Sequence, residues 1–165
     1  MLQLTLIRHA KSSWENPALS DFDRPLNKRG RKNAPLMGKV IRKLGLVFEQ
    51  IVSSPALRAI TTARSIAEKL GFPEQDVVQR ADLYDASLNA LLDCVSSLDN
   101  RYSKIALVAH NPGITALCNH LTGESITNLP TCALALIEFD LDDWRAVDQD
   151  TGRLALYEYP RKYMD

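Results

Sequence analysis

The sequence has few cysteines, no long apolar run and no excess of charge of either sign. The three cysteines lack C-x-x-C spacing, which argues against a disulfide framework or a zinc knuckle. A membrane-spanning helix needs about eighteen consecutive apolar residues, and no such run occurs. Twenty basic residues balance twenty acidic ones, so no net field attracts nucleic acid or a membrane surface. We therefore expect neither nucleic acid nor a membrane as a partner.

Several catalytic motifs are also missing. There is no G-x-x-x-x-G-K-[ST] loop for nucleotide phosphates and no G-x-S-x-G turn for a serine nucleophile. The three histidines form no H-E-x-x-H or H-x-H pair, so we expect no catalytic metal and no cofactor. Cys94 precedes Arg101 with six residues between them, which does not fit the spacing of a cysteine-dependent tyrosine phosphatase.

Length and composition are those of an ordinary globular domain. With 165 residues, of which 45% are hydrophobic and 24% charged, the chain is expected to form one domain over residues 1–165. The apolar run at the amino terminus is too short for a signal peptide and ends in Arg8-His9. Together with the cysteine content, this predicts a cytoplasmic protein.

Short apolar runs alternate with helical patterns along the chain. Strands are expected at 2–7, 48–53, 77–78, 104–109, 133–140 and 153–159, and helices at 27–44, 55–70, 86–98 and 113–121. This alternation predicts a three-layer α/β/α sandwich with a mainly parallel central sheet. Asn27 is expected to cap the first helix and Ser54 the second. Pro35 is expected to make the first turns of the first helix irregular or to kink the helix.

Three expected strands end in residues that suit an anion. The sequences at these ends are Arg8-His9, S-S-P-A-L followed by Arg58, and His110-N-P-G. If the strands are parallel, their ends meet at one edge of the sheet together with two helix N-termini. Arginine donates two aligned hydrogen bonds to phosphate oxygens, and a neutral imidazole can attack phosphorus and later leave. The edge therefore predicts a phosphate site that contains a histidine nucleophile.

The motifs R-H-A-K-S-S-W, S-S-P-A-L-R-A-x-x-T-A and H-N-P-G occur here in the order and spacing of the histidine phosphatase (phosphoglycerate-mutase-like) superfamily. The chain resembles this superfamily over nearly its whole length, which implies a phosphoglycerate-mutase-like fold. Within it, the chain is similar to the small SixA-type phosphohistidine phosphatases of signal transduction. The features behind this second resemblance are the alanine after Arg8-His9, R-P-L at 24–26, L-Y-D-A-S at 83–87 and the H-N-P-G form.

The resemblance implies a role for each residue of these motifs. His9 would accept the phosphoryl group as a covalent intermediate, which water then hydrolyses. Arg8 and Arg58 would hold the phosphoryl oxygens, and His110 would stabilise the charge of the transition state. Positioning and electrostatic stabilisation of this kind dominate phosphoryl transfer.

The general acid is the least defined part of the site. Many members of the superfamily use a carboxylate from the segment before the third motif, and Asp85 is the nearest candidate here. Asp85 could equally cap the helix expected from Ala86, and Asp21 or Asp23 in the long segment 10–26 are alternatives. SixA-type proteins resemble one another in lacking an obvious acid. A phosphohistidine substrate does not need one, because a ring nitrogen is a better leaving group than an alkoxide.

These features predict a metal-independent phosphatase that acts on phosphohistidine in a protein, such as a histidine-phosphotransfer domain. The chain has no insertion long enough for a closed lid, which favours an open site. Small phosphomonoesters would also fit such a site, so a small-molecule phosphatase is the alternative. A mutase is disfavoured because little sequence is left to shield its intermediate from water. A non-catalytic phosphate-binding module would need Arg8, Arg58 and His110 but not His9. The basic run 28–32 is either a solvated helix face or a contact for an acidic partner.

Overall fold

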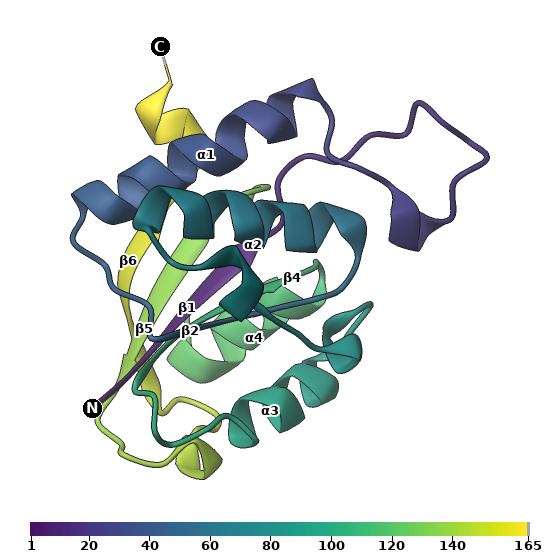
Figure 1. Ribbon diagram of the computed structural model, residues 1–165. Coiled ribbons are helices and arrows are strands. Elements are labelled where there is room, and N and C mark those ends of the chain that lie inside the picture. The colour runs from purple at the N-terminus through teal and green to yellow at the C-terminus, as the bar shows by residue number, and fades with distance from the viewer. Residues whose placement is uncertain (165) are drawn as a thin grey trace.

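A six-stranded mixed sheet forms the centre of the protein, seen here in a computed structural model that describes residues 1–164 (Figure 1). The strands are β1 (Leu2–Arg8), β2 (Gln50–Ser53), β3 (Val78–Gln79), β4 (Lys104–Ala109), β5 (Leu134–Phe139) and β6 (Gly152–Glu158). They lie in the order β3-β2-β4-β1-β5-β6. The first four of these are parallel to one another, whereas β5 runs antiparallel to both of its neighbours. The mainly parallel sheet is confirmed.

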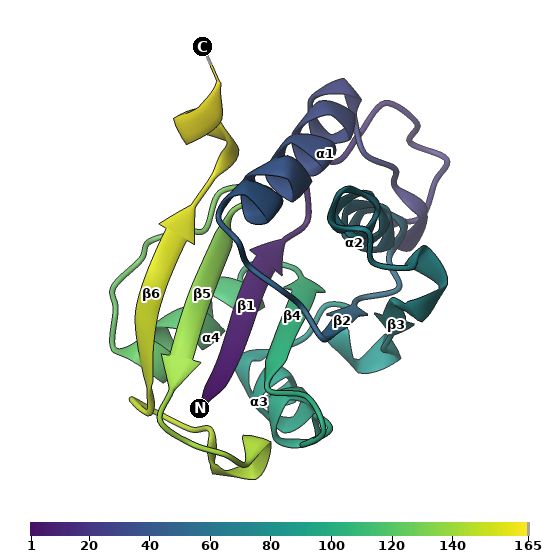
Figure 2. The ribbon, with the colours of Figure 1, turned by 60° about the vertical axis from the view of Figure 1, so that its left-hand side comes forward.

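Helices cover both faces of this sheet. They are α1 (Lys28–Lys43), α2 (Leu57–Leu70), α3 (Leu88–Ser96) and α4 (Gly113–Thr122), with short 3-10 turns at Asp21–Asp23, Glu74–Asp76, Ala81–Leu83, Trp144–Ala146 and Pro160–Tyr163. Figure 2 shows α1 and α2 on one face and α3 and α4 on the other. An apolar cluster fills each interface, one around Met37 and Ile66 and the other around Leu91 and Leu117. Burial of each such side chain contributes about 1.5–3 kcal/mol, so the three-layer sandwich is stabilised from both sides.

β1 is the strand that sets the position of the site. It lies between β4 and β5, so both of its faces are covered, which explains its almost continuous apolar sequence. In the parallel pair of β1 and β4, Arg8 lies opposite Ala109. The next residue of each strand is a histidine, so His9 and His110 leave the sheet side by side.

The first helix forms largely as expected. The side chain of Asn27 accepts a hydrogen bond from the amide of Gly30 and caps α1. The expected irregular first turns are not found, because α1 is continuous from Lys28 through Pro35. A kink at Pro35 stays a prediction. Pro35 is half-buried at the surface, where water can satisfy the carbonyl that a proline leaves free.

The next two helices begin later than the sequence predicts. α2 starts at Leu57 without a side-chain cap, so the expected capping by Ser54 is wrong. The hydroxyl of Ser54 is instead engaged at the candidate site. α3 starts at Leu88, and Ser87 caps it by accepting a hydrogen bond from the amide of Ala90. The alternative role of Asp85 as a helix cap is therefore also wrong.

Candidate active site

The structure brings the four motif residues together at the C-terminal edge of the parallel strands. Arg8 is the last residue of β1 and His9 follows it, His110 follows β4, and Arg58 lies in the first turn of α2, which follows β2. The ring centroids of the two histidines are 5.1 Å apart. Arg58 and both histidines are buried, each with 6–7% of its surface exposed. The predicted meeting of these strand ends is therefore found.

His9 is held as a neutral base. Its Nδ1 lies 2.7 Å from the carbonyl oxygen of Ala10, and a carbonyl can only accept, so Nδ1 carries the proton. Nε2 is then left with a free electron pair. Burial, together with the positive charges of nearby groups such as Arg58, lowers the pKa of His9 from 6.5 to about 3. The ring is therefore neutral at pH 7, with its one proton on Nδ1, and its free Nε2 can act as a nucleophile.

His110 is oriented by the hydroxyl of Ser54, which the sequence had predicted to cap a helix. Its Nε2 lies 2.7 Å from Oγ of Ser54, which also accepts a hydrogen bond from the amide of Ala56. When the hydroxyl of Ser54 donates a hydrogen bond to Nε2, the one proton of the neutral ring lies on Nδ1. Nδ1 is buried and has no partner among the described residues. Burial, and next the charge of Arg58, lower the pKa of His110 to about 4. The ring of Tyr84 packs edge-on against it at 5.7 Å.

The two predicted arginines are each anchored on one side and free on the other. Nη1 of Arg8 donates to the carbonyl of Leu129 at 2.8 Å. Arg58 donates from Nη1 to the carbonyl of Asp21 at 2.6 Å and from Nη2 to the carboxylate of Asp21 at 3.0 Å. Nε of both arginines is buried and has no partner in the described structure. Since unpaired buried donors are costly, these groups are suited to an anionic ligand.

A third guanidinium, that of Arg24, joins the site from the long loop 10–26. Arg24 is 7% exposed, and its Nη1 is also buried without a partner. Its guanidinium carbon lies 3.4 Å from the centroid of the Trp14 ring, and its Nε lies 3.2 Å from the carboxylate of Asp21. In the sequence, R-P-L at 24–26 served only as a feature of the family resemblance, and the position of Arg24 in the site was not predicted. The available signal was an arginine that ends an unusually long loop beside the predicted site.

Asp21 links this loop to the rest of the site. Its carboxylate accepts a hydrogen bond from the hydroxyl of Tyr84 at 2.7 Å in addition to the bond from Arg58. Both bonds, with that of Tyr84 the stronger influence, hold the pKa of Asp21 below its usual range. An ionised carboxylate cannot donate a proton, which argues against Asp21 as the general acid. Asp23 is exposed and accepts a hydrogen bond from the hydroxyl of Ser20.

Asp85 lies at the mouth of the site. Its backbone has a φ of 51°, in the left-handed region, and its side chain is exposed. Its charge raises the pKa of His110, which shows that it lies within electrostatic reach of that ring. In the described residues its carboxylate has no hydrogen-bond partner that would fix its orientation. The role of Asp85 as a general acid remains a prediction.

Among residues 1–164, no group of three or more His, Cys, Asp or Glu side chains is arranged to hold a metal ion. Over the same residues, no helix is both long and apolar enough to cross a membrane.

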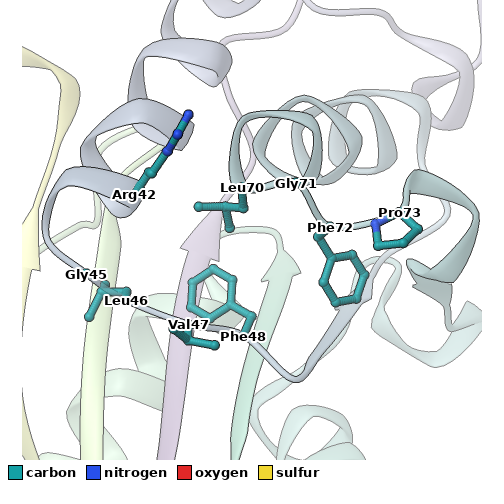
Figure 3. Close-up of a pocket in the computed structure, with 9 residues that line it drawn as sticks. All are labelled: Arg42, Gly45, Leu46, Val47, Phe48, Leu70, Gly71, Phe72 and Pro73. Atoms are coloured by element: carbon teal, nitrogen blue, oxygen red, sulfur yellow. The ribbon is translucent and has the colours of Figure 1, made fainter.

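A separate hollow lies at the opposite edge of the sheet. It has a volume of about 360 Å³ and lies where the C-terminal ends of α1 and α2 meet the segment before β2. Its lining is mainly apolar and includes the rings of Phe48 and Phe72, whereas the side chain of Arg42 points away from these rings (Figure 3). It contains no histidine, cysteine or carboxylate, so it lacks the groups that phosphoryl transfer needs.

Comparison with known proteins identifies the family of this chain. The pattern of the histidine phosphatase superfamily (branch 1) matches residues 4–94, a range that includes Arg8, His9 and Arg58. An uncharacterised chloroplastic protein of Arabidopsis thaliana is 31% identical over 150 residues, which cover 86% of this chain and 68% of that protein. An uncharacterised protein of Mycobacterium leprae is 25% identical over 94% of this chain and its own full length.

Solved structures show the same fold. The protein histidine phosphatase SixA in complex with tungstate has a TM-score of 0.84 and 22% identity, over 99% of this chain and 100% of SixA. An Agrobacterium tumefaciens protein proposed to be the phosphohistidine phosphatase SixA has a TM-score of 0.82 and 25% identity, over 96% of this chain and 98% of that one. The phosphoglycerate-mutase-like fold is confirmed. Because the superfamily pattern covers more than half of the sequence, the chain belongs to branch 1 of the histidine phosphatase superfamily and is a phosphatase.

Proposed function

We propose that this phosphatase transfers a phosphoryl group to Nε2 of His9 and then hydrolyses the phosphohistidine that forms. The observation that carries this proposal is the hydrogen bond from Nδ1 of His9 to the carbonyl of Ala10, at 2.7 Å. It leaves the electron pair on the other ring nitrogen. His110, Arg58 and Arg8, which act electrostatically on this ring, each have a buried nitrogen without a partner among the described residues. Burial keeps the ring neutral, as a nucleophile requires.

The phosphoryl group is held by positive charge on several sides. The free N–H groups of Arg8, Arg24 and Arg58 bind its oxygens, and Nδ1–H of His110 donates to one of them. Three guanidiniums face two carboxylates, Asp21 and the more distant, exposed Asp85, so the site keeps a net positive charge that attracts a phosphate. Fixed donors of this kind stabilise the charge that develops during transfer. In this scheme the guanidiniums supply the charge that a metal ion supplies in other phosphatases.

The reaction proceeds in two displacements at phosphorus. In the first, the electron pair on Nε2 of His9 forms a new P–N bond. The bond between phosphorus and the leaving group breaks, and its electron pair goes with the leaving group. In the second, water attacks the phosphohistidine, the P–N bond breaks and its electron pair returns to Nε2. Phosphate is released, and the ring is neutral again.

The substrate that fits these groups best is phosphohistidine on a protein, such as a histidine-phosphotransfer domain. When the leaving ring is protonated on its other nitrogen, it departs as neutral imidazole and needs no acid from the enzyme. This suits a site in which Asp21 is ionised. The similarity to SixA structures supports the same branch of the superfamily. A small phosphomonoester is the alternative, and its leaving alkoxide would draw a proton from Asp85.

Turnover of an aryl phosphate and of a phosphohistidine protein, measured side by side without added metal, tests this proposal. Replacement His9→Ala is expected to abolish both activities, by at least about 10³-fold, because it removes the nucleophile. Rapid acid-free quenching of the wild type with labelled substrate is expected to trap label on His9. The ratio of the two rates decides between the protein substrate and the small-molecule alternative.

His120 provides the matched control. It is the third histidine of the chain, and its ring lies 3.6 Å from Asp148 rather than in the site. His120→Ala should therefore retain both activities. Full activity of His9→Ala would overturn the mechanism. Phosphate binding by a wild type that turns over neither substrate would instead favour the non-catalytic binding module.

A further inference from the structure

Helix α1 concentrates positive charge in a protein whose net charge is zero. It holds seven of the twenty basic residues and no acidic one: Lys28, Arg29, Arg31, Lys32, Lys39, Arg42 and Lys43. All seven are exposed. Within residues 1–164, none of them forms an ion pair, although nine ion pairs occur elsewhere. Among these residues, then, no carboxylate lies within ion-pair distance of the basic side chains of this helix.

The four lysines of α1 lie in one stripe along the helix. Lys28, Lys32, Lys39 and Lys43 are separated by four, seven and four residues, so they share one face of the helix. The stripe extends over about 22 Å, given the rise of 1.5 Å per residue. A stripe of like charges repels itself, so it gains stability when an anion binds along it.

A groove follows this lysine stripe, between α1 and the C-terminal turn Pro160–Tyr163, which lies against α1 in Figure 1. One hollow of about 450 Å³ is bordered by Lys32, Lys39 and Tyr163. The next, of about 330 Å³, is bordered by Lys39, Lys43 and again Tyr163. Because the two hollows share residues, they form one elongated groove with an apolar floor and a basic rim.

A further hollow, separate from this groove, lies by the first turn of α1 and near the end of β1. This third hollow, of about 410 Å³, is lined by Arg29 and by Pro130. The residues that flank this proline in sequence contact the end of β1: the carbonyl of Leu129 accepts from Arg8, and the amide of Cys132 donates to the carbonyl of Arg8. A segment that lay along the lysine stripe and reached this hollow would come close to the end of β1, where Arg8 lies.

We propose that the lysine stripe and its groove dock an acidic segment of the phosphoprotein that this enzyme dephosphorylates. This inference rests on the proposed function and adds to it a second contact, outside the site. Carboxylates spaced along the segment pair with the lysines, while its apolar side chains lie on the groove floor near Tyr163. The contact places the phosphohistidine at the mouth of the site and raises its effective concentration there.

A protein segment fits this surface better than a membrane does. A helix that binds a bilayer inserts its apolar face, but the apolar residues of α1, including Met37 and Ile41, are buried against α2 and the sheet. What α1 offers to a partner is a row of charges beside a narrow apolar floor. That arrangement matches an acidic amphipathic segment.

Two peptides with one phosphohistidine each test the proposal, one with glutamates at helical spacing and the other with glutamines in their place. The wild type is expected to have the higher kcat/KM for the glutamate peptide. Lys32→Gln combined with Lys39→Gln should lower that value about 3- to 10-fold, since each exposed pair contributes modestly. Turnover of the glutamine peptide and of an aryl phosphate should not change. Added salt should reduce the preference of the wild type.

The matched control is Arg101→Gln combined with Lys104→Gln, which removes two exposed cations far from α1 in sequence and on other elements. It should keep the preference for the glutamate peptide. Fluorescence anisotropy with the unphosphorylated glutamate peptide tests docking separately, so failure of the proposed function cannot be mistaken for failure of docking. Equal binding of the two peptides, or equal loss in the control variant, would overturn the proposal. Binding to phosphatidylserine vesicles in place of the glutamate peptide would overturn it as well.

Discussion

At the scale of single residues, two adjacent serines show how a buried hydroxyl can serve either structure or chemistry. Ser53 and Ser54 both have no exposed surface. The hydroxyl of Ser53 donates to the carbonyl of Ser54, whereas the hydroxyl of Ser54 contacts Nε2 of His110. Only Ser54 can therefore decide which nitrogen of His110 carries the proton.

We predict that Ser54→Ala lowers kcat/KM about 10- to 100-fold, the usual cost of losing the partner that orients a functional imidazole. His110 would lose its fixed tautomer and donate less well to the phosphoryl group. Ser53→Ala is the control, because it removes a hydroxyl of equal burial that does not touch His110. Steady-state kinetics of both variants, with their unfolding curves, check this. Equal losses in the two would show a purely structural effect.

At the scale of elements, the start of α4 is pressed against the segment that carries Asp85. A Cβ on Gly113 would lie 2.3 Å from the carbonyl oxygen of Ala86, which is backbone and cannot rotate away. The glycine of H-N-P-G is thus explained by the close approach of two chain segments. That approach also brings Tyr84 against the ring of His110.

We predict that Gly113→Ala destabilises the fold by about 2 kcal/mol, as overpacking does. Helix propensity alone would give the opposite sign, a gain of about 1 kcal/mol, but the clash with backbone outweighs it. Urea unfolding measures the change. Gly71→Ala serves for comparison, since a Cβ added there would have no atom within 4 Å. The cost of this substitution is limited to the backbone strain of a φ of 69°. A more stable Gly113→Ala protein would contradict the packing argument.

At the scale of the whole molecule, His9 and His110 lower the free energy of unfolding at low pH. His9 and His110 have pKa values lowered from 6.5 to about 3 and about 4, mainly by burial. In the unfolded chain both would take up a proton near pH 6.5. Between about pH 6.5 and 3 the unfolded state therefore binds more protons, and stability falls as the pH falls.

We predict that each histidine removes roughly 2 kcal/mol from the free energy of unfolding between pH 7.5 and pH 5. Carboxylates also titrate in this range, so the informative quantity is a difference between proteins. His9→Asn should lose roughly 2 kcal/mol less than the wild type over the same interval. Denaturant unfolding at several pH values tests this, and parallel curves for the two proteins would refute it.

The sequence alone determined the sheet, the helices around it and the four motif residues at its edge. These follow from local patterns: apolar runs end in Arg8-His9 and His110, and Asn27 precedes a helical pattern it can cap. Parallel strands then bring their ends together without further information. Superfamily membership was visible for the same reason, since its motifs are short and contiguous.

Only the tertiary structure decided which side chains complete the site. Ser54 contacts a ring 56 residues away, and Arg58 binds a carboxylate 37 residues away. Such pairs depend on how loops pack, and local sequence periodicity carries no information about loop packing. For this reason Ser54 was wrongly predicted to cap a helix. The place of Arg24 in the candidate site was not predicted for the same reason, because it depends on the path of a long loop. Periodicity specifies elements, but packing assigns partners to buried polar groups.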